Sequence, residues 1–173
     1  MKKLFPFIIV AIFGFLLISC ERTEYVDNSV PTDYPAVYDL KNVSFSYNQD
    51  LGWHYGQSFN KPLLDQDYVI IFRQSGTSNN SPVWQQIPAT IYPYNNNLEF
   101  NYDFDFSKND FMIYAGGNYD ITTTPQYMNN QTYRVVLVPA VFGKNANAGD
   151  LSKMSYEEVI AKYNIDDSKV GTF

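Results

Sequence analysis

One histidine and several closely spaced carboxylates are the residues with the most obvious chemical potential. His54 lies in the segment LGWHYG (51–56) and would have to be the base of a serine triad, yet the sequence has no Gly-x-Ser-x-Gly elbow. A zinc site needs about three or four His, Cys or carboxylate ligands, which one histidine does not supply. The sequence therefore predicts no catalytic residue and no metal site, and His54 is expected on the surface or on an edge strand.

Neighbouring carboxylates raise the question of glycoside hydrolysis. A glycosidase uses two carboxyl groups that the fold brings to about 5 to 9.5 Å from separate positions, and such a pair cannot be identified from spacing alone. Adjacent acids are more typical of a solvated face. The adjacent pairs are Asp65/Asp67, Asp103/Asp105 and Glu157/Glu158.

The acidic stripe, defined here as Glu99, Asn101, Asp103 and Asp105, could also be considered for calcium. Side chains two residues apart on a strand are separated by about 6.8 Å, so neighbouring carboxylates could reach one ion. Calcium requires about six to eight oxygen ligands, however, and a straight strand supplies only about two or three. We expect a solvated face offset by lysine or arginine on the adjacent strand, with no metal and no cofactor.

The composition restricts the class of protein. The chain has 173 residues, of which 45% are hydrophobic, 17% aromatic and 17% charged, and this predicts one folded soluble domain. The formal net charge is -6, and removal of Lys2 and Lys3 with a cleaved leader makes it -8 (-6 - 2). Because this charge disfavours phosphate contacts, no nucleic-acid partner is expected.

The N-terminus reads as a secretory signal. Residues 4–18 (LFPFIIVAIFGFLLI) are an apolar run between two lysines and the pair Ser19-Cys20. As a helix the run would span about 22 Å, less than the roughly 30 Å hydrocarbon core of a bilayer. A cleaved signal peptide, residues 1–19, is therefore favoured over a permanent span.

The motif Leu17-Ile18-Ser19-Cys20 resembles the lipobox of bacterial lipoproteins, in which an aliphatic residue at -3 and a small residue at -1 precede a cysteine. The resemblance implies cleavage between Ser19 and Cys20, a diacylglycerol on the Cys20 sulfur and a fatty acid such as palmitate on the new amino group. It implies export and anchoring to the cell envelope, with the periplasmic or surface face of the outer membrane as the expected location. Membrane lipid is the partner expected for acylated Cys20, which is the only cysteine of the chain.

A tether is expected between the lipid and the domain. Residues 21–35 (ERTEYVDNSVPTDYP) show little periodicity, and a flexible coil of this length has an r.m.s. reach of about 20 Å. We assign residues 20–35 to the lipidated cysteine and tether, and residues 36–173 to a single domain. Glu21, Glu24 and Asp27 are similar to the acidic signals that send lipoproteins of the Bacteroidota to the outer cell surface.

Period-two alternation is the strongest structural pattern of the domain. Residues 98–106 alternate aromatic or aliphatic with acidic or amide side chains, and Val43, Phe45 and Tyr47 alternate with serines. Five further runs predict strands, at 68–73, 83–87, 89–94, 111–115 and 132–138. Turn formers separate these strands at 75–82, 95–97, 107–110 and 116–118.

Short connections between successive strands predict antiparallel hairpins. The fold class is therefore all-β, an antiparallel sandwich or a flattened barrel of about seven to eight strands. Ser155 and Glu158 form a capping box, which predicts one short helix near 155–164, packed on an edge or end of the sheets.

Residues 83–142 resemble a group of small Bacteroidota lipoproteins, some of which carry collagen-like repeats between the lipid and the domain. The likeness lies in a VW-x-x-x-P start followed by LEFNYDFDF, FMIYAGGNYDITTTP and YRVVLVPAVF. This chain has a short tether without Gly-x-y repeats. The resemblance implies a cell-envelope protein but no particular activity.

The sequence favours a non-catalytic protein with a structural or interaction role. The alternative is a binding module that uses exposed aromatic side chains to contact a glycan or an envelope protein. A hydrolase is the least favoured class. The candidate ligand-binding residues are Trp53, Tyr55, Trp84, Tyr92 and Tyr94.

Overall fold

The computed structural model describes residues 37–65, 67–94, 97–138 and 153–173. The expected signal peptide, Cys20 and the tether lie outside these residues. Within the described part of the chain, no helix has the length and apolar character needed to cross a membrane.

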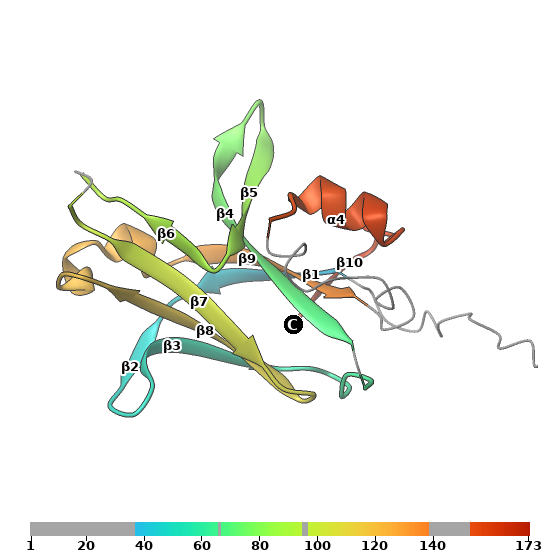
Figure 1. Cartoon of the computed structure of the whole chain (residues 1–173), viewed down its shortest axis with the longest axis horizontal. Helices are drawn as coiled ribbons and strands as arrows, with labels where there is room; N and C mark the ends of the chain where they lie inside the picture. Colours follow the sequence, from blue (N-terminus) through green and yellow to red (C-terminus); the bar gives the residue numbers. More distant parts are fainter. Residues whose placement is uncertain (1–36, 66, 95–96, 139–152) are drawn as a thin grey trace, which may run out of the picture.

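The described residues form ten strands in two five-stranded sheets, here called sheet A and sheet B (Figure 1). Sheet A contains, in spatial order, β10 (Val170–Thr172), β1 (Val37–Val43), β9 (Gln131–Val138), β4 (Tyr68–Ser78) and β5 (Ser81–Ile87). Sheet B contains β2 (Ser46–Asn48), β3 (Gly52–Ser58), β8 (Asp110–Gly117), β7 (Phe100–Phe106) and β6 (Ala89–Ile91). The expected all-β sandwich is confirmed.

The strand count and direction differ from the expectation in detail. Three strands, β2, β6 and β10, have only three residues each, too few for an alternation to be recognised. The pairing of β1 with β10 is parallel, whereas the other pairs of described strands are antiparallel. Two single-turn 3-10 helices, η1 (Ile121–Thr123) and η2 (Pro125–Tyr127), connect β8 to β9.

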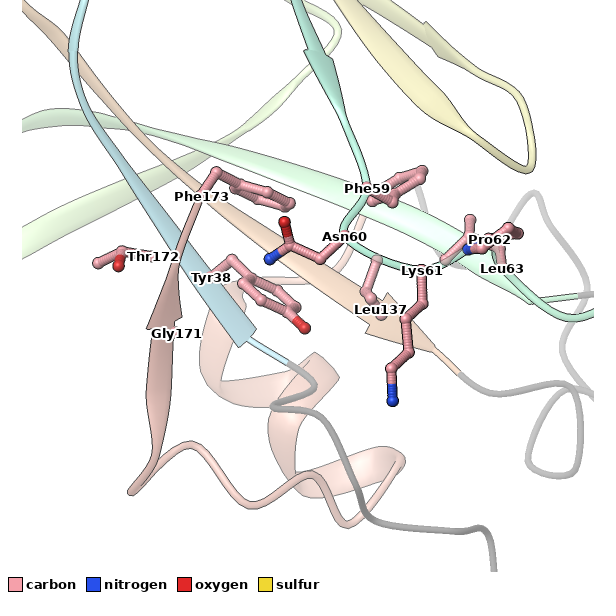
Figure 2. Close-up of a pocket in the computed structure, with 10 residues that line it drawn as sticks. All are labelled: Tyr38, Phe59, Asn60, Lys61, Pro62, Leu63, Leu137, Gly171, Thr172 and Phe173. Carbon is pink, nitrogen blue, oxygen red and sulfur yellow. The ribbon is translucent and has the colours of Figure 1, made fainter.

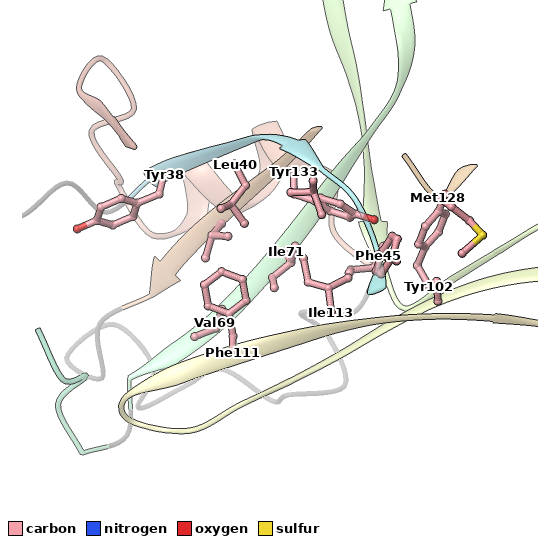
Figure 3. Packing of buried hydrophobic residues seen from close by; sticks show 14 of the residues in the cluster. Tyr38, Leu40, Phe45, Val69, Ile71, Tyr102, Phe111, Ile113, Met128 and Tyr133 are labelled. Atoms are coloured by element: carbon pink, nitrogen blue, oxygen red, sulfur yellow. The ribbon is translucent and has the colours of Figure 1, made fainter. Parts of the chain in front are cut away.

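The main core fills the space between the two sheets. In Figure 3 the side chains of β1, β4 and β9 meet those of β7 and β8, as the alternation along the strands requires. Phe100 and Tyr102 of β7 are 0% and 1% exposed, whereas Phe104 and Phe106 are only half-buried. The inward direction predicted for this aromatic set is confirmed, and its burial is greatest in the first half of the strand.

A second apolar layer covers the opposite face of sheet A. Ile70 and Phe72 of β4 and Val136 of β9 pack there against the helix α4 (Tyr156–Lys162), which lies on the side of sheet A away from sheet B (Figure 1). Because sheet A is buried on both faces, β4 and β9 contain continuous apolar runs rather than strict alternation.

The capping box of this helix is confirmed in both directions. The Ser155 hydroxyl accepts a hydrogen bond from the Glu158 amide, and the Glu158 carboxylate accepts one from the Ser155 amide. Asn164 follows the helix with φ 47°, which stops it where the sequence indicated. The expected position on an edge or end of the sheets is wrong, since the helix buries Tyr156, Val159 and Tyr163 on a sheet face.

Two local predictions are wrong, namely a single strand through residues 43–47 and a loop at residues 75–82. The alternation at Val43, Phe45 and Tyr47 is not one strand, because β1 ends at Val43 in sheet A and β2 begins at Ser46 in sheet B. The segment 75–82 is not a loop. Strands β4 and β5 extend through it as an exposed hairpin that projects from the sandwich, and only Asn79 and Asn80, with φ 49° and 63°, form the turn (Figure 1).

Two further boundaries shift. Strand β6 stops at Ile91 rather than continuing to Tyr94. Strand β8 includes Gly116 and Gly117, where a turn was expected. A Cβ on Gly117 would lie 2.5 Å from the Glu99 carbonyl oxygen. The absence of a side chain at Gly117 therefore allows the backbone at the start of β7 to approach the end of β8 closely.

Candidate functional site

The sandwich has two ends, which differ in the strand termini, turns and helices that lie there. Strands β1 and β10 begin, and β3 and β9 end, at what we call the pocket end. The β2–β3 hairpin, the last residue of β6, the first residue of β7 and the helices η1 and η2 lie at the opposite end, the loop end (Figure 1).

A cavity of about 300 Å³ opens at the pocket end (Figure 2). Its aromatic part consists of Tyr38 from β1, Phe59 after β3 and Phe173 after β10. The rings of Tyr38 and Phe173 are stacked with their centroids 4.6 Å apart, and the Phe59 centroid lies 6.2 Å from that of Phe173. Pro62, Leu63 and Leu137 add aliphatic surface.

The chain segment after β3 is held by backbone hydrogen bonds to the turn between β7 and β8. The Phe59 amide donates to the Asn109 carbonyl at 2.8 Å, and the Leu63 amide donates to the Lys108 carbonyl at 2.8 Å. Phe173 is positioned from the other side, because β10 pairs in parallel with the first residues of β1. Three segments distant in the sequence therefore form one cavity wall.

The polar groups of the cavity are Asn60, Lys61 and Thr172, together with the Tyr38 hydroxyl. Figure 2 shows the Asn60 amide directed toward the rings of Tyr38 and Phe173, while the Lys61 ammonium extends away from them. The lining contains no carboxylate side chain. Within the described residues, side-chain ion pairs form only between Lys108 and Asp65 and between Arg134 and Asp39, so Lys61 has no such partner there.

The five aromatic residues predicted as ligand contacts do not form one site. Trp53 and Tyr55 of β3 are half-buried and pack against the main core. Tyr92 and Tyr94 follow β6 at the loop end and are 55% and 75% exposed. Gln126 donates a hydrogen bond of 3.3 Å to the Tyr94 hydroxyl, which links that tyrosine to η2.

The fifth, Trp84 of β5, lies beneath α4. The Arg134 guanidinium stacks 4.5 Å from the Trp84 ring centroid and 5.1 Å from that of Tyr156. Arg134 also forms two hydrogen bonds to the Asp39 carboxylate, of 2.7 and 3.1 Å. Trp84 is thus part of the contact that joins the helix to sheet A, and it is not presented to a ligand.

The sequence did not single out Tyr47, which is 63% exposed on β2 and packs its ring edge-on against Trp53 at 5.4 Å. Its place in the alternation of residues 43–47 suggested a core position. The cavity residues were also missed, because Tyr38, Phe59 and Phe173 are isolated aromatics at strand ends. Only the pairing of β10 with β1 would have predicted their meeting.

The acidic stripe lies on the uncovered face of sheet B, but its expected basic neighbours are absent. Across the sheet, Asp103 is paired with Tyr114 and Asp105 with Met112. The Tyr114 hydroxyl donates a hydrogen bond of 2.9 Å to Asp105. Burial, followed by this contact with a carboxylate, raises the pKa of Tyr114. The prediction of charge compensation by lysine or arginine is therefore wrong.

His54 lies half-buried on β3, between Ser46 of β2 and Tyr114 of β8, with Nδ1 3.1 Å from the Gly52 carbonyl oxygen. Since Trp53 and Tyr55 face the core, alternation directs His54 to the uncovered face of sheet B. Across the described ranges, no three His, Cys, Asp or Glu side chains gather closely enough to hold a metal ion.

A buried polar cluster stabilises the loop end. Arg73 is 7% exposed, donates a hydrogen bond of 2.9 Å to Gln131, and lies 4.7 Å from the Tyr102 ring centroid. Gln131 in turn donates to the carbonyls of Gln126 and Asn129. These contacts fix the chain from η2 to β9, and burial raises the pKa of Tyr102.

No family model matches the chain, and no curated protein or solved structure matches it.

Proposed function

We propose that the protein is a lipid-anchored component of a bacterial cell envelope with a non-catalytic interaction role. The observation that carries the proposal is the motif Leu17-Ile18-Ser19-Cys20 after a short basic and apolar leader. The sulfur of Cys20 is the proposed attachment point for diacylglycerol, and the outer membrane is the proposed location.

The direction of β1 supports an interaction role for the loop end. Sixteen residues, 21–36, separate Cys20 from Val37, where β1 begins at the pocket end. The loop end is the opposite end of the sandwich, so in an anchored protein it is the end farther from the point of attachment. Its exposed aromatic side chains are therefore available to other envelope molecules.

Three tyrosines are the best candidates for such contacts. Tyr92 and Tyr94 follow β6, one edge strand of sheet B, and Tyr47 lies on β2, the other edge strand. Four strand spacings of about 4.8 Å separate the two edges, roughly 19 Å. Tyr92 and Tyr94 are close enough in the chain to contact one sugar or one protein side chain together, whereas Tyr47 would contribute a separate site.

Glycan binding is the second candidate function, favoured by the 55% and 75% exposure of Tyr92 and Tyr94. Exposed tyrosine rings stack on the apolar faces of sugars while the hydroxyl remains hydrated. A glycan array distinguishes this function from a purely structural role, because a structural protein gives no saturable binding.

Lipidation is tested by growing expressing cells with an alkynyl fatty acid and joining a fluorophore to the labelled proteins. The wild type is expected to be labelled and to have lost its leader, whereas Cys20→Ala is expected to remain unlabelled. Cys20→Ser is a matched control, because its hydroxyl preserves size but cannot form the thioether. An unlabelled wild type at the full precursor mass would refute the proposal.

A further inference from the structure

We propose that Tyr94 is a fixed stacking surface for an uncharged glycan at the loop end. This inference rests on glycan binding as the second candidate function, and it names the ring that recognises the sugar and the charge class of the ligand. It is carried by the backbone conformation at Tyr94, the support of its ring by η2 and the charge of sheet B.

The backbone of Tyr94 has a conformation that tyrosine rarely adopts. Its φ is 65°, in the left-handed region, where a Cβ is crowded by the neighbouring carbonyl oxygen. Apart from glycine, every other described residue with a positive φ is an asparagine, and these are Asn42, Asn79, Asn80, Asn130 and Asn164. Asparagine would be the less strained residue at position 94, so the turn itself does not explain the tyrosine.

Stability does not explain this tyrosine either. Tyr94 is 75% exposed, so its ring contributes little to the core. Gln126 Nε2 donates a hydrogen bond of 3.3 Å to the Tyr94 hydroxyl, and an exposed bond of this length adds little to the stability of the fold. What the bond does is hold an exposed ring in one orientation.

The helix η2 is a rigid support for Gln126. The Tyr127 ring packs with its centroid 5.6 Å from that of Phe100, and the Tyr102 hydroxyl donates to the Tyr127 carbonyl at 2.6 Å. The Gln126 carbonyl accepts a further hydrogen bond of 2.9 Å from Gln131. A ring that is already fixed loses little conformational freedom when a sugar stacks on it, so more of the contact energy becomes affinity.

The charge of the surrounding surface limits the class of ligand. No strand of sheet B contains a lysine or an arginine, and neither does η1 or η2. Arg73 reaches the loop end from β4, but it is 7% exposed and donates to Gln131. The exposed charges of this half of the domain include the carboxylates of Asp103, Asp105 and Asp120. A sulfated, phosphorylated or uronic acid sugar would be repelled here, whereas an uncharged sugar would not.

The polar partner of the ring favours a sugar over a basic peptide. A basic peptide would also suit an acidic surface, but the group that contacts the Tyr94 hydroxyl is the amide of Gln126 rather than a carboxylate. An amide has both donors and an acceptor, as the hydroxyl groups of a sugar require. The apolar face of the sugar would then lie on the tyrosine ring.

The test uses the full-length protein in a polyoxyethylene detergent, which carries no sugar, on an array of oligosaccharides in charge-matched pairs. The pairs are N-acetyllactosamine oligomers with and without sulfate, mannan oligomers with and without phosphate, and oligogalacturonates with and without methyl esters. We expect saturable binding to at least one neutral member and binding about tenfold weaker, or less, to its acidic counterpart.

The decisive variant is Tyr94→Asn, because asparagine removes the ring and suits the left-handed backbone. Its urea midpoint should equal or exceed that of the wild type, and its affinity for the neutral glycan should fall by about tenfold or more. Gln126→Ala keeps the ring but releases it, and should weaken binding by about three- to fivefold. Leu64→Ala, at a 60% exposed position between β3 and β4, is the surface control and should change neither quantity.

Two results would overturn this inference while leaving glycan binding in place. They are equal or tighter binding of the acidic members, and unchanged glycan binding by Tyr94→Asn. The absence of saturable binding to every member of the array would refute the glycan function together with this inference. A hexa-arginine peptide is the probe for the competing class, and peptide binding that Tyr94→Asn abolishes, without glycan binding, would assign the ring to a basic partner instead.

Discussion

The contact between Arg134 and Asp39 should be among the most stabilising polar interactions outside the main core. It joins β9 to β1 through two hydrogen bonds of 2.7 and 3.1 Å, and the two side chains are 15% and 16% exposed. The same guanidinium donates to the Tyr156 hydroxyl at 3.2 Å and stacks on Trp84. One charged group therefore connects two strands of sheet A to β5 and α4.

The magnitude follows from this limited exposure. Breaking a fully buried pair costs about 3–5 kcal/mol, whereas exposed pairs contribute about 0–1 kcal/mol. Arg134 and Asp39 are nearer the buried limit, but some water reaches them. We expect a coupling free energy of about 1.5–3 kcal/mol, the range of hydrogen bonds to charged groups.

A double-mutant cycle measures this coupling directly. It uses Asp39→Asn, Arg134→Met and the double variant, with free energies of unfolding taken from urea titrations. The matched cycle is Asp65→Asn with Lys108→Met, because those side chains are 80% and 62% exposed. Its coupling should be below about 0.5 kcal/mol. Equal coupling in the two cycles would falsify the argument from burial.

Two further predictions concern β7 and the buried tyrosines. Phe100→Ala should lower the free energy of unfolding by about 3–5 kcal/mol because Phe100 is 0% exposed. Asp105→Ala, on the uncovered face of sheet B, should change it by less than about 0.5 kcal/mol. Urea unfolding of both variants measures these changes, and similar losses of stability would contradict the assigned faces of β7. Desolvation and then the hydrogen bond to Asp167 raise the pKa of Tyr156 from 10.0 to about 12. The folded state retains this proton when the unfolded state has released it, so this contribution to stability is complete below pH about 10 and is lost as the pH rises to about 12. Tyrosinate absorbance measures the ionisation of the tyrosines, and unfolding midpoints between pH about 9 and 12 measure the loss of stability. Tyr156→Phe should make that loss less steep. An unchanged pH dependence in the variant would rule out Tyr156 as a contributor.

The sheet architecture was predictable because a half-buried strand leaves a pattern of period two. In β7, Phe100 and Tyr102 face the core and Asn101 and Asp103 face outward, as the alternation indicated. The same rule predicted that one face would carry the acids. It did not predict their neighbours, since the register that places Tyr114 beside Asp103 is a non-local property of the β7–β8 pair.

Two kinds of sequence information were misleading. Ser, Gly, Asn and Pro in residues 75–82 indicated a loop, but an exposed hairpin needs no apolar side chains beyond the sandwich. Conversely, Phe45 and Tyr47 had an alternation typical of one strand. The chain instead passes from sheet A to sheet B there, and the Phe45 amide donates to the Met128 carbonyl at 3.1 Å rather than to a strand partner.

The cavity could not be predicted from local pattern, and the physical reason is the position of β10. Val170–Thr172 is too short to be recognised as a strand, yet its parallel pairing with β1 brings Phe173 to Tyr38. Without that pairing, Lys61 and Asn60 would belong to an ordinary connection after β3.

The high aromatic content is explained mainly by the three layers of the domain, which are helix α4, sheet A and sheet B. Because Cys20 is the only cysteine and lies before the domain, no disulfide can stabilise it, and large side chains must fill two separate interfaces. Tyr102 and Tyr133 do so between the sheets, and Tyr156 and Tyr163 do so beneath α4. An aromatic side chain of this protein is therefore a candidate ligand contact only if it packs in neither interface. Tyr92 and Tyr94 are exposed and meet this condition, whereas Trp84 packs against Arg134 and Tyr156 beneath α4 and does not.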